Sequence, residues 1–233
     1  MKFAVLLVLV FAICCSPQPD TPPPAGPVRA TPPAPEASQA SQAPHAPQAP
    51  KIVFLGDSLT AGLGLPSTQS FPSLIGQKLK EKGLDYEIVN AGVSGDTSAG
   101  GLRRLDWSLD GNVRVLIVAL GANDGLRGLS TSEMKKNLAA VLDRARERNV
   151  PVILAGMEAP PNYGPDYTRD FRSVYTELAA EYDVRFIPFL LQGVAGNASL
   201  NQGDGIHPNP RGAAMVADLV WKELESELRR QKQ

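Results

Sequence analysis

Two short segments of this chain carry residue types that suit nucleophilic catalysis by a serine. Ser58 lies shortly after an apolar run, and His207 lies three residues after Asp204 in a turn that contains glycine. A serine hydroxyl is a poor nucleophile at neutral pH, so it needs a base within hydrogen-bond reach and a third group that orients the base. The spacing lets the Asp204 carboxylate fold back onto the imidazole of His207, where it would fix the tautomer and stabilise the imidazolium.

The search for the base is short because the chain has only two histidines. His45 stands in a segment rich in Pro and Ala, where we expect a solvated side chain, so His207 is the one histidine of the predicted folded domain. Taken alone, a histidine in a loop before a helix is more often structural, because polar loop residues commonly bond their own turn. With one histidine and no cysteine in that domain, we predict no metal site.

Three further aspartates stand next to candidate site residues in the chain. We interpret Asp57, Asp96 and Asp124 as structural, because Asp side chains at junctions between strands and helices usually cap backbone N–H groups. Arg103 and Arg104 receive the same structural interpretation. A hydrolase built on paired carboxylates stays open in principle, but no carboxylate pair here accounts for the serine segment.

Four segments of the chain, in order, resemble the four sequence blocks of the SGNH (GDSL-like) hydrolases. The resemblance spans about residues 52–221 and is strongest to the bacterial branch of arylesterases and multifunctional acyl-CoA thioesterase I. Any one block would be a weak signal, whereas four blocks in register are specific. The segments are residues 56–62 (GDSLTAG), 90–97 (NAGVSGDT), 120–125 (LGANDG) and 204–209 (DGIHPN).

The resemblance implies a role for each matching residue. Ser58 would be the nucleophile, His207 the base and then the acid, and Asp204 the group that orients His207. The oxyanion hole would consist of the backbone N–H groups of Ser58 and Gly95 and the side-chain amide of Asn123. Losing one such donor typically lowers the rate about 100-fold to 1,000-fold.

Physical arguments agree with these roles. Ser58 follows a predicted strand, where the start of a helix would present free N–H groups to an oxyanion. Gly95 has no side chain, so its backbone can approach a substrate closely. The segment Gly56-Asp57-Ser58 differs from the Gly-x-Ser-x-Gly elbow, which disfavours the α/β-hydrolase fold.

The elements that must position these residues alternate along the chain. Apolar runs rich in β-branched residues alternate with stretches of helical period, which predicts a parallel sheet wrapped by helices. Right-handed crossovers then give an α/β fold, a three-layer α/β/α sandwich around a five-stranded parallel sheet, and the resemblance implies its flavodoxin-like form. The expected strands are 51–55, 86–90, 113–120, 150–155 and 184–188, and the expected helices are 71–82, 98–109, one capped by Ser130 or Thr131 and running to about 148, 166–182 and 210–228.

In such sheets a ligand binds beyond the carboxyl ends of the strands. We therefore expect an acyl pocket in the loops 126–129, 157–167 and 189–200, whose apolar content suits an acyl chain better than a sugar. Residues 125–129 also resemble the substrate loop of the thioesterase I branch. The alternative is that some of these side chains only pack the core. The candidate substrate-binding residues are Leu126, Leu129, Met157, Tyr163 and Phe189.

Three functions fit these observations. The first is an esterase, thioesterase or lysophospholipase that acts through an acyl-enzyme and needs no cofactor. The second is a carbohydrate O-acetylesterase. The third is a non-catalytic binding module on the same scaffold, since a fold does not fix a function. The third is disfavoured because every catalytic position is filled.

The first fifty residues differ from the rest in composition. Residues 1–15 combine a charged start with an apolar run too short to span a bilayer, which predicts a signal peptide and a periplasmic or extracellular protein. Cys14 and Cys15 end that run, where a lipoprotein signal would place an acylated thiol, although no small residue precedes either one. Lipidation of Cys14 or Cys15 would tether the protein to a membrane, whereas a cleaved signal would remove both.

The rest of the chain divides at about residue 50. Residues 16–50 are dominated by Pro, Ala, Gln and Ser, which predicts a disordered tether, and residues 51–233 form the predicted hydrolase domain. The formal net charge is −1, and Lys and Arg are scattered among Asp and Glu. Nothing therefore favours a nucleic acid as partner.

Overall fold

The computed structural model describes residues 49–232, and they contain the predicted five-stranded parallel sheet. The predictions for the signal peptide, for Cys14 and Cys15 and for nearly all of the tether lie outside the described residues. The strands run in the order β2-β1-β3-β4-β5, all parallel. Their bounds are β1 Lys51–Gly56, β2 Glu87–Gly92, β3 Val113–Ala119, β4 Val152–Ala155 and β5 Arg185–Ile187.

The central strands are buried on both faces. In β1 and β3 nearly every side chain is apolar and inaccessible to solvent, as a parallel sheet covered by two helical layers requires. The paired strands hold Phe54 level with Ile117 and Leu55 level with Val118. Because their carboxyl ends are in register, the segments that follow β1 and β3 leave the sheet side by side.

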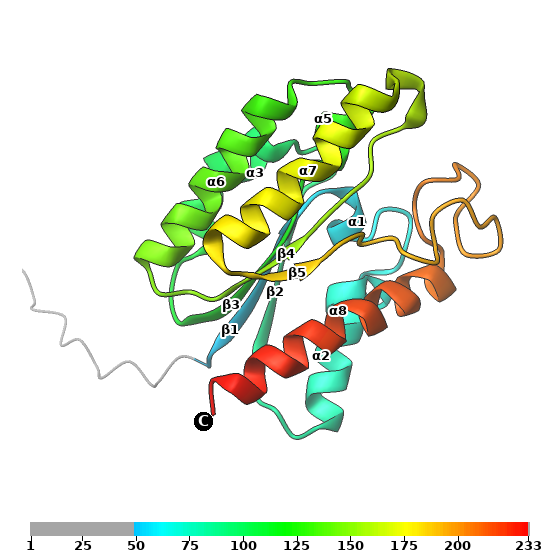
Figure 1. Ribbon diagram of the computed structural model, residues 1–233. Helices are drawn as coiled ribbons and strands as arrows, with labels where there is room; N and C mark the ends of the chain where they lie inside the picture. The colour runs from blue at the N-terminus through cyan, green and yellow to red at the C-terminus, as the bar shows by residue number, and fades with distance from the viewer. Residues whose placement is uncertain (1–48, 233) are drawn as a thin grey trace, which may run out of the picture. The chain divides into compact units, whose positions relative to one another are not determined.

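Helices cover both faces of the sheet (Figure 1). In the view of Figure 1, α3, α6 and α7 lie above the sheet and α2 and α8 lie below it. The predicted three-layer α/β/α sandwich is therefore confirmed. The α-helices are α1 Ser58–Ala61, α2 Phe71–Glu81, α3 Ser98–Arg103, α4 Leu105–Ser108, α5 Ala122–Leu126, α6 Thr131–Glu147, α7 Pro165–Tyr182 and α8 Pro210–Arg230, and the short 3-10 turns are Ser67–Gln69 and Pro161–Tyr163.

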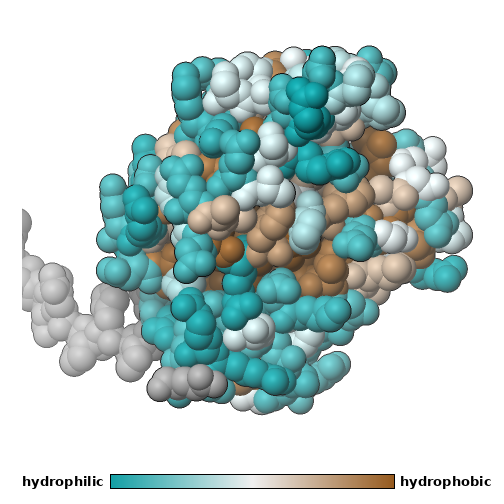
Figure 2. Space-filling model, in the orientation of Figure 1, coloured by the Kyte–Doolittle hydropathy of each residue, from teal (hydrophilic) through white to brown (hydrophobic). Residues whose placement is uncertain are grey.

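The long helices are amphipathic and their ends carry the expected signals. In α7 the buried side chains recur three or four residues apart, from Phe171 through Val174, Tyr175 and Leu178. Ser130 caps α6 by accepting from the N–H of Glu133, as predicted. Figure 2 shows the polar outer surfaces of these helices and a band of apolar residues between α7 and α8. Among residues 49–232, no helix is long and apolar enough to cross a membrane.

One predicted helix is wrong in its length. The stretch 98–109 is two short helices, α3 and α4, which meet at Arg104. Gly100 and Gly101 are poor helix formers, and Arg104 leaves the helical conformation, with φ −108° and ψ 7°. Arg104 directs its side chain to the ends of β1 and β2 instead.

The strand order places a crevice at the middle of the sheet. The chain moves from β1 outward to β2 and then crosses back to β3 on the other side of β1. The point where the strand order reverses lies between β1 and β3, and open α/β sheets bind ligands there. Ser58 follows β1 and Asn123 follows β3, so the two residues flank this crevice.

Candidate active site

Ser58, His207 and Asp204 form one chain of hydrogen bonds. The Oγ of Ser58 lies 2.9 Å from the Nε2 of His207, and the Nδ1 of His207 lies 2.6 Å from the Oδ2 of Asp204. Ser58 comes from the end of β1, whereas the other two come from the loop between β5 and α8. With Nδ1 donating to the carboxylate, Nε2 is the nitrogen that can accept the serine proton.

The Asp204 carboxylate also shapes the turn that carries His207. Its Oδ1 accepts the backbone N–H groups of Ile206 and His207, each at 3.0 Å. These donors and the imidazole lower the pKa of Asp204 to about 2, although the side chain is exposed. The turn is further held because the N–H of Gln202 donates to the carbonyl of His207 at 2.7 Å. The carboxylate is therefore ionised at any pH at which the site would work.

Ser58 is the first residue of α1, and the local sequence explains why it sits there. The Asp57 side chain caps this helix by accepting from the N–H of Leu59, as predicted for this aspartate. Gly56 must lack a side chain, because a Cβ there would collide with Thr60. Within residues 49–232 the Ser58 N–H has no hydrogen-bond acceptor, which leaves it available to an anionic oxygen.

The loop after β2 presents a second unpaired donor. Gly95 has φ +83°, a conformation that favours glycine, and its N–H also lacks an acceptor in the described part of the chain. The carbonyl of Gly95 accepts from the Arg127 guanidinium at 2.9 Å. The loop is thus fixed while its N–H stays open to a ligand.

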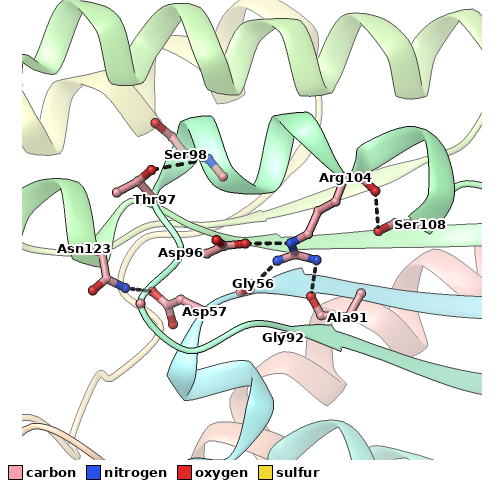
Figure 3. Close-up of polar contacts among 12 residues, drawn as sticks. Gly56, Asp57, Ala91, Gly92, Asp96, Thr97, Ser98, Arg104, Ser108 and Asn123 are labelled. Carbon is pink, nitrogen blue, oxygen red and sulfur yellow. Dashed lines mark hydrogen bonds and ion pairs between the residues drawn. The ribbon is translucent and has the colours of Figure 1, made fainter.

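Asn123 stands on the other side of the crevice, at the start of α5. Its Nδ2 donates to the Oδ2 of Asp57 at 3.3 Å (Figure 3). An amide nitrogen has two hydrogens, so the second remains for a substrate oxygen. Asp57 is almost fully buried, and burial raises its pKa to about 6 even though Leu59 and Asn123 donate to it.

A cavity of about 370 Å³ opens beside Ser58 and His207. Leu126, Met157 and Phe189, three of the five candidate substrate-binding residues, line it. Leu129 and Tyr163 lie outside its lining, and the Tyr163 hydroxyl donates to the carbonyl of Leu126 at 2.9 Å. Much of the remaining lining is apolar and includes Leu59, Ala122, Ala159, Pro160, Leu191, Ala195 and Ile206.

Comparison with known proteins identifies the family. The profile of the GDSL-like Lipase/Acylhydrolase family matches residues 54–215. The chain is 41% identical over 175 residues to Esterase TesA of Pseudomonas aeruginosa, covering 75% of this chain and 87% of that protein. It is 37% identical to the Thioesterase 1/protease 1/lysophospholipase L1 of Escherichia coli, covering 75% and 83%.

A solved structure agrees with the sequence comparison. The psychrotrophic esterase EstA from Pseudoalteromonas sp., inhibited by monoethylphosphonate, superposes with a TM-score of 0.73 at 33% identity, covering 77% of this chain and 98% of that one. The chain belongs to the GDSL-like lipase/acylhydrolase family. It is an SGNH hydrolase of the esterase and thioesterase kind, and this confirms the family predicted from the four sequence blocks.

The other two aspartates of this SGNH hydrolase differ in their roles. Asp124 is buried and accepts from the backbone N–H and the hydroxyl of Ser98, at 2.8 and 2.6 Å, so it caps the start of α3 from another element. Asp96, also interpreted as structural, does not cap backbone N–H groups as expected. Its carboxylate instead pairs with Arg104, while Thr97 caps α3. Among residues 49–232, no cluster of His, Cys, Asp and Glu is arranged to hold a metal ion.

Sequence reasoning did not single out several residues of the SGNH site, among them Ile206 and Arg127. Ile206, which directly precedes His207 in the chain, lines the cavity. Arg127 holds the carbonyl of Gly95 across a separation of 32 residues. The blocks gave no signal for Arg127, because a contact between two loops of different strands leaves no periodic pattern in the sequence.

Proposed function

We propose that this chain hydrolyses carboxylic esters and thioesters of acyl groups, with Ser58 as nucleophile, His207 as base and then acid, and Asp204 as the residue that orients His207. The observation that carries the proposal is the chain of hydrogen bonds of 2.9 and 2.6 Å that joins these three side chains. A binding module would need neither the serine nor its base in this arrangement.

The first step acylates the serine. The Oγ of Ser58 gives its proton to the Nε2 of His207 and forms a bond to the acyl carbon, while the carbonyl electrons move onto the oxygen. The N–H groups of Ser58 and Gly95 and the amide of Asn123 would stabilise this oxyanion. When the carbonyl re-forms, the bond to the alcohol or thiol breaks, and the leaving group takes the proton from Nε2.

The second step releases the acid. A water molecule gives a proton to Nε2 and its oxygen attacks the acyl carbon of the ester on Ser58, which regenerates an oxyanion in the same hole. Collapse of this intermediate expels the Oγ of Ser58, which takes the proton from Nε2. Throughout both steps the ionised Asp204 would stabilise the imidazolium of His207.

The cavity supports an acyl group as the part of the substrate that the chain recognises. Leu126, Met157 and Phe189 offer apolar surface next to Ser58, and burying a methylene group contributes about 0.8 kcal/mol. Several of its relatives are esterases or thioesterases by name, and one is also a lysophospholipase. A cavity of about 370 Å³ has room for an acyl chain longer than acetate.

The test is hydrolysis of p-nitrophenyl esters from acetate to palmitate by the wild-type protein and by Ser58→Ala. We expect turnover of butyrate to octanoate and a loss of at least about 1,000-fold in the variant. If the folded wild-type protein cleaves only acetate, the chain is an O-acetylesterase. If the folded wild-type protein cleaves none of the esters, or if Ser58→Ala retains full activity, the serine mechanism is wrong.

We also propose that the protein is exported and is tethered to a membrane through an acylated Cys14 or Cys15. The apolar run in residues 3–11 and the two cysteines that follow it support this proposal. Cell fractionation together with incorporation of labelled fatty acid into the wild type, Cys14→Ser and Cys15→Ser tests both parts. An uncut protein in the cytosol contradicts export, and an exported protein without label contradicts lipidation.

A further inference from the structure

Arg104 makes three hydrogen bonds to three different segments behind the crevice (Figure 3). Its Nε donates to the Oδ2 of Asp96 at 2.6 Å, its Nη1 to the carbonyl of Ala91 at 2.5 Å, and its Nη2 to the carbonyl of Gly56 at 2.7 Å. The side chain is about four-fifths buried, with 20% of its surface exposed. One guanidinium therefore joins the end of β1, the end of β2 and the loop after β2.

The carbonyl of Gly56 is the centre of this arrangement. It accepts from the backbone N–H of Val93 at 3.0 Å and from Arg104 at 2.7 Å, so both of its lone pairs have a donor. Val93 belongs to the loop that carries Gly95, and Gly56 stands two residues before Ser58. Contacts at this one oxygen therefore set the spacing between the strand of the nucleophile and the loop of the second backbone donor.

The contact with Asp96 fixes the same loop from its far side. Asp96 directly follows Gly95 in the chain, and its carboxylate is 18% exposed. Gly100 leaves room for this carboxylate, because a Cβ at that position would collide with it. A buried guanidinium and a buried carboxylate offset each other's desolvation when they are hydrogen-bonded, so the pair can hold a defined geometry inside the protein.

We propose that Arg104 is a positioning residue for the oxyanion hole. It holds the N–H of Gly95 and the N–H of Ser58 at the spacing that one substrate oxygen requires, without touching the substrate. The inference rests on the function proposed above, in which those two N–H groups stabilise the oxyanion. A planar fork with five N–H donors can reach three acceptors at once, whereas a lysine ammonium is a compact point charge on a flexible stem.

The experiment compares Arg104→Gln, Arg104→Lys and the control Arg103→Gln on p-nitrophenyl butyrate. Arg103 is the neighbouring residue in the chain and is exposed, so its replacement should leave kcat and KM unchanged. For Arg104→Gln we expect kcat to fall about 10-fold to 100-fold, less than the 100-fold to 1,000-fold typical of deleting an oxyanion donor outright. KM should change less than about 3-fold, because ground-state binding of the acyl chain does not use the hole.

A second readout separates positioning from general loss of structure. An alkyl trifluoromethyl ketone forms a reversible adduct with Ser58 whose oxygen is negative, so its inhibition constant should rise by the same factor as kcat/KM falls. Titration of competent sites with a phosphonate, read at its end point, normalises kcat to folded enzyme. If kcat per competent site equals the wild-type value, Arg104 is only structural and the inference is overturned.

Two further variants test the geometry. We expect Arg104→Lys to fold but to keep the lowered kcat of Arg104→Gln. A wild-type kcat in Arg104→Lys would show that hydrogen bonds to three acceptors at once are not required. Asp96→Asn keeps the side-chain shape and leaves Gly56 and Ala91 bonded to Arg104. It should show the same pattern with a smaller fall in kcat, so it tests the inference even if Arg104→Gln does not fold. Wild-type kcat in Asp96→Asn would contradict it.

These outcomes remain distinct from failure of the proposed function. If wild type and Ser58→Ala are equally inactive, the proposed function fails whatever the Arg104 variants do. If wild type is active and Ser58→Ala is not, while Arg104→Gln matches the control Arg103→Gln, the function stands and only the inference on Arg104 is lost.

Discussion

The two sides of Ser58 are assembled from contacts of very different range. On the base side, Asp204 and His207 lie three residues apart in one loop, and a single carboxylate accepts three hydrogen bonds within it. On the proposed oxyanion side, the three candidate donors follow three separate strands, and Arg104, Asp57 and Arg127 hydrogen-bond to the segments that carry them. The base side is local in sequence, whereas the oxyanion side exists only once the sheet has formed.

The two sides also differ in electrostatics. The exposed Asp204 has its pKa lowered to about 2 by the groups that donate to it. The buried Asp57 has its pKa raised to about 6, because burial outweighs its two donors. The base side therefore keeps its negative charge down to low pH, whereas burial disfavours the negative charge of Asp57, so this carboxylate takes up a proton at a higher pH. The following variants test this contrast.

The largest effect should come from the base side. Asp204→Asn removes the charge that stabilises the imidazolium and lets an amide hold the wrong tautomer, so we expect kcat/KM for p-nitrophenyl butyrate to fall about 1,000-fold to 10,000-fold. Asp85→Asn, an exposed aspartate beyond the site, serves as the control. A fall of less than 10-fold would show that His207 does not depend on this carboxylate.

On the oxyanion side, Asn123→Ala removes one donor and leaves the others. We expect kcat to fall about 100-fold to 1,000-fold with little change in KM, because the amide would bind the oxygen only once it becomes negative. Steady-state kinetics on the same ester measures both constants. A change confined to KM would place Asn123 in substrate binding instead.

Asp57→Asn should change stability in a pH-dependent way. Because the pKa of Asp57 is raised from 3.8 to about 6, the folded state binds its proton more tightly than the unfolded state does, and ionising this group lowers stability as pH rises from about 4 to 6. Relative to wild type, Asp57→Asn should therefore gain up to about 3 kcal/mol in unfolding free energy between pH 4 and pH 7.

Urea unfolding of both proteins at pH 4.5 and 7.5 measures this difference. Asp204→Asn, compared with wild type at pH 2.5 and 4.5, should show the opposite sign, since a lowered pKa contributes stability above about pH 4 that is lost as pH falls toward 2. If the unfolding free energies of wild type and Asp57→Asn stay parallel over this range, Asp57 carries no raised pKa.

The smallest effect concerns the cavity that both sides border. Leu126→Ala removes apolar surface from a half-exposed side chain, so kcat/KM for octanoate relative to acetate should fall about 5-fold, or about 1 kcal/mol. Leu129→Ala is the matched control, because Leu129 is similarly exposed but lies outside the cavity lining. Equal losses in the two variants would show that the cavity does not bind the acyl chain.

Much of the fold could be predicted from the sequence because its signals are local. The buried runs of β1 and β3 and the periodic apolar face of α7 report burial directly, and the five strands lie close to their predicted places along the chain. The stretch 98–109 could not be predicted correctly. Arg104, where the helix breaks, donates to the carbonyls of Gly56 and Ala91, and the local sequence pattern does not predict these distant contacts.

The sequence alone determined the family, the sheet and helix order and the pairing of Asp204 with His207, because residue types at short spacings carry that information. Only the tertiary structure decided which polar groups support the oxyanion donors, which of the five predicted cavity residues line it, and which carboxylate is buried. These properties depend on contacts between segments far apart in the chain, such as Asn123 with Asp57 across 66 residues, and the packed sheet sets the distances between those segments.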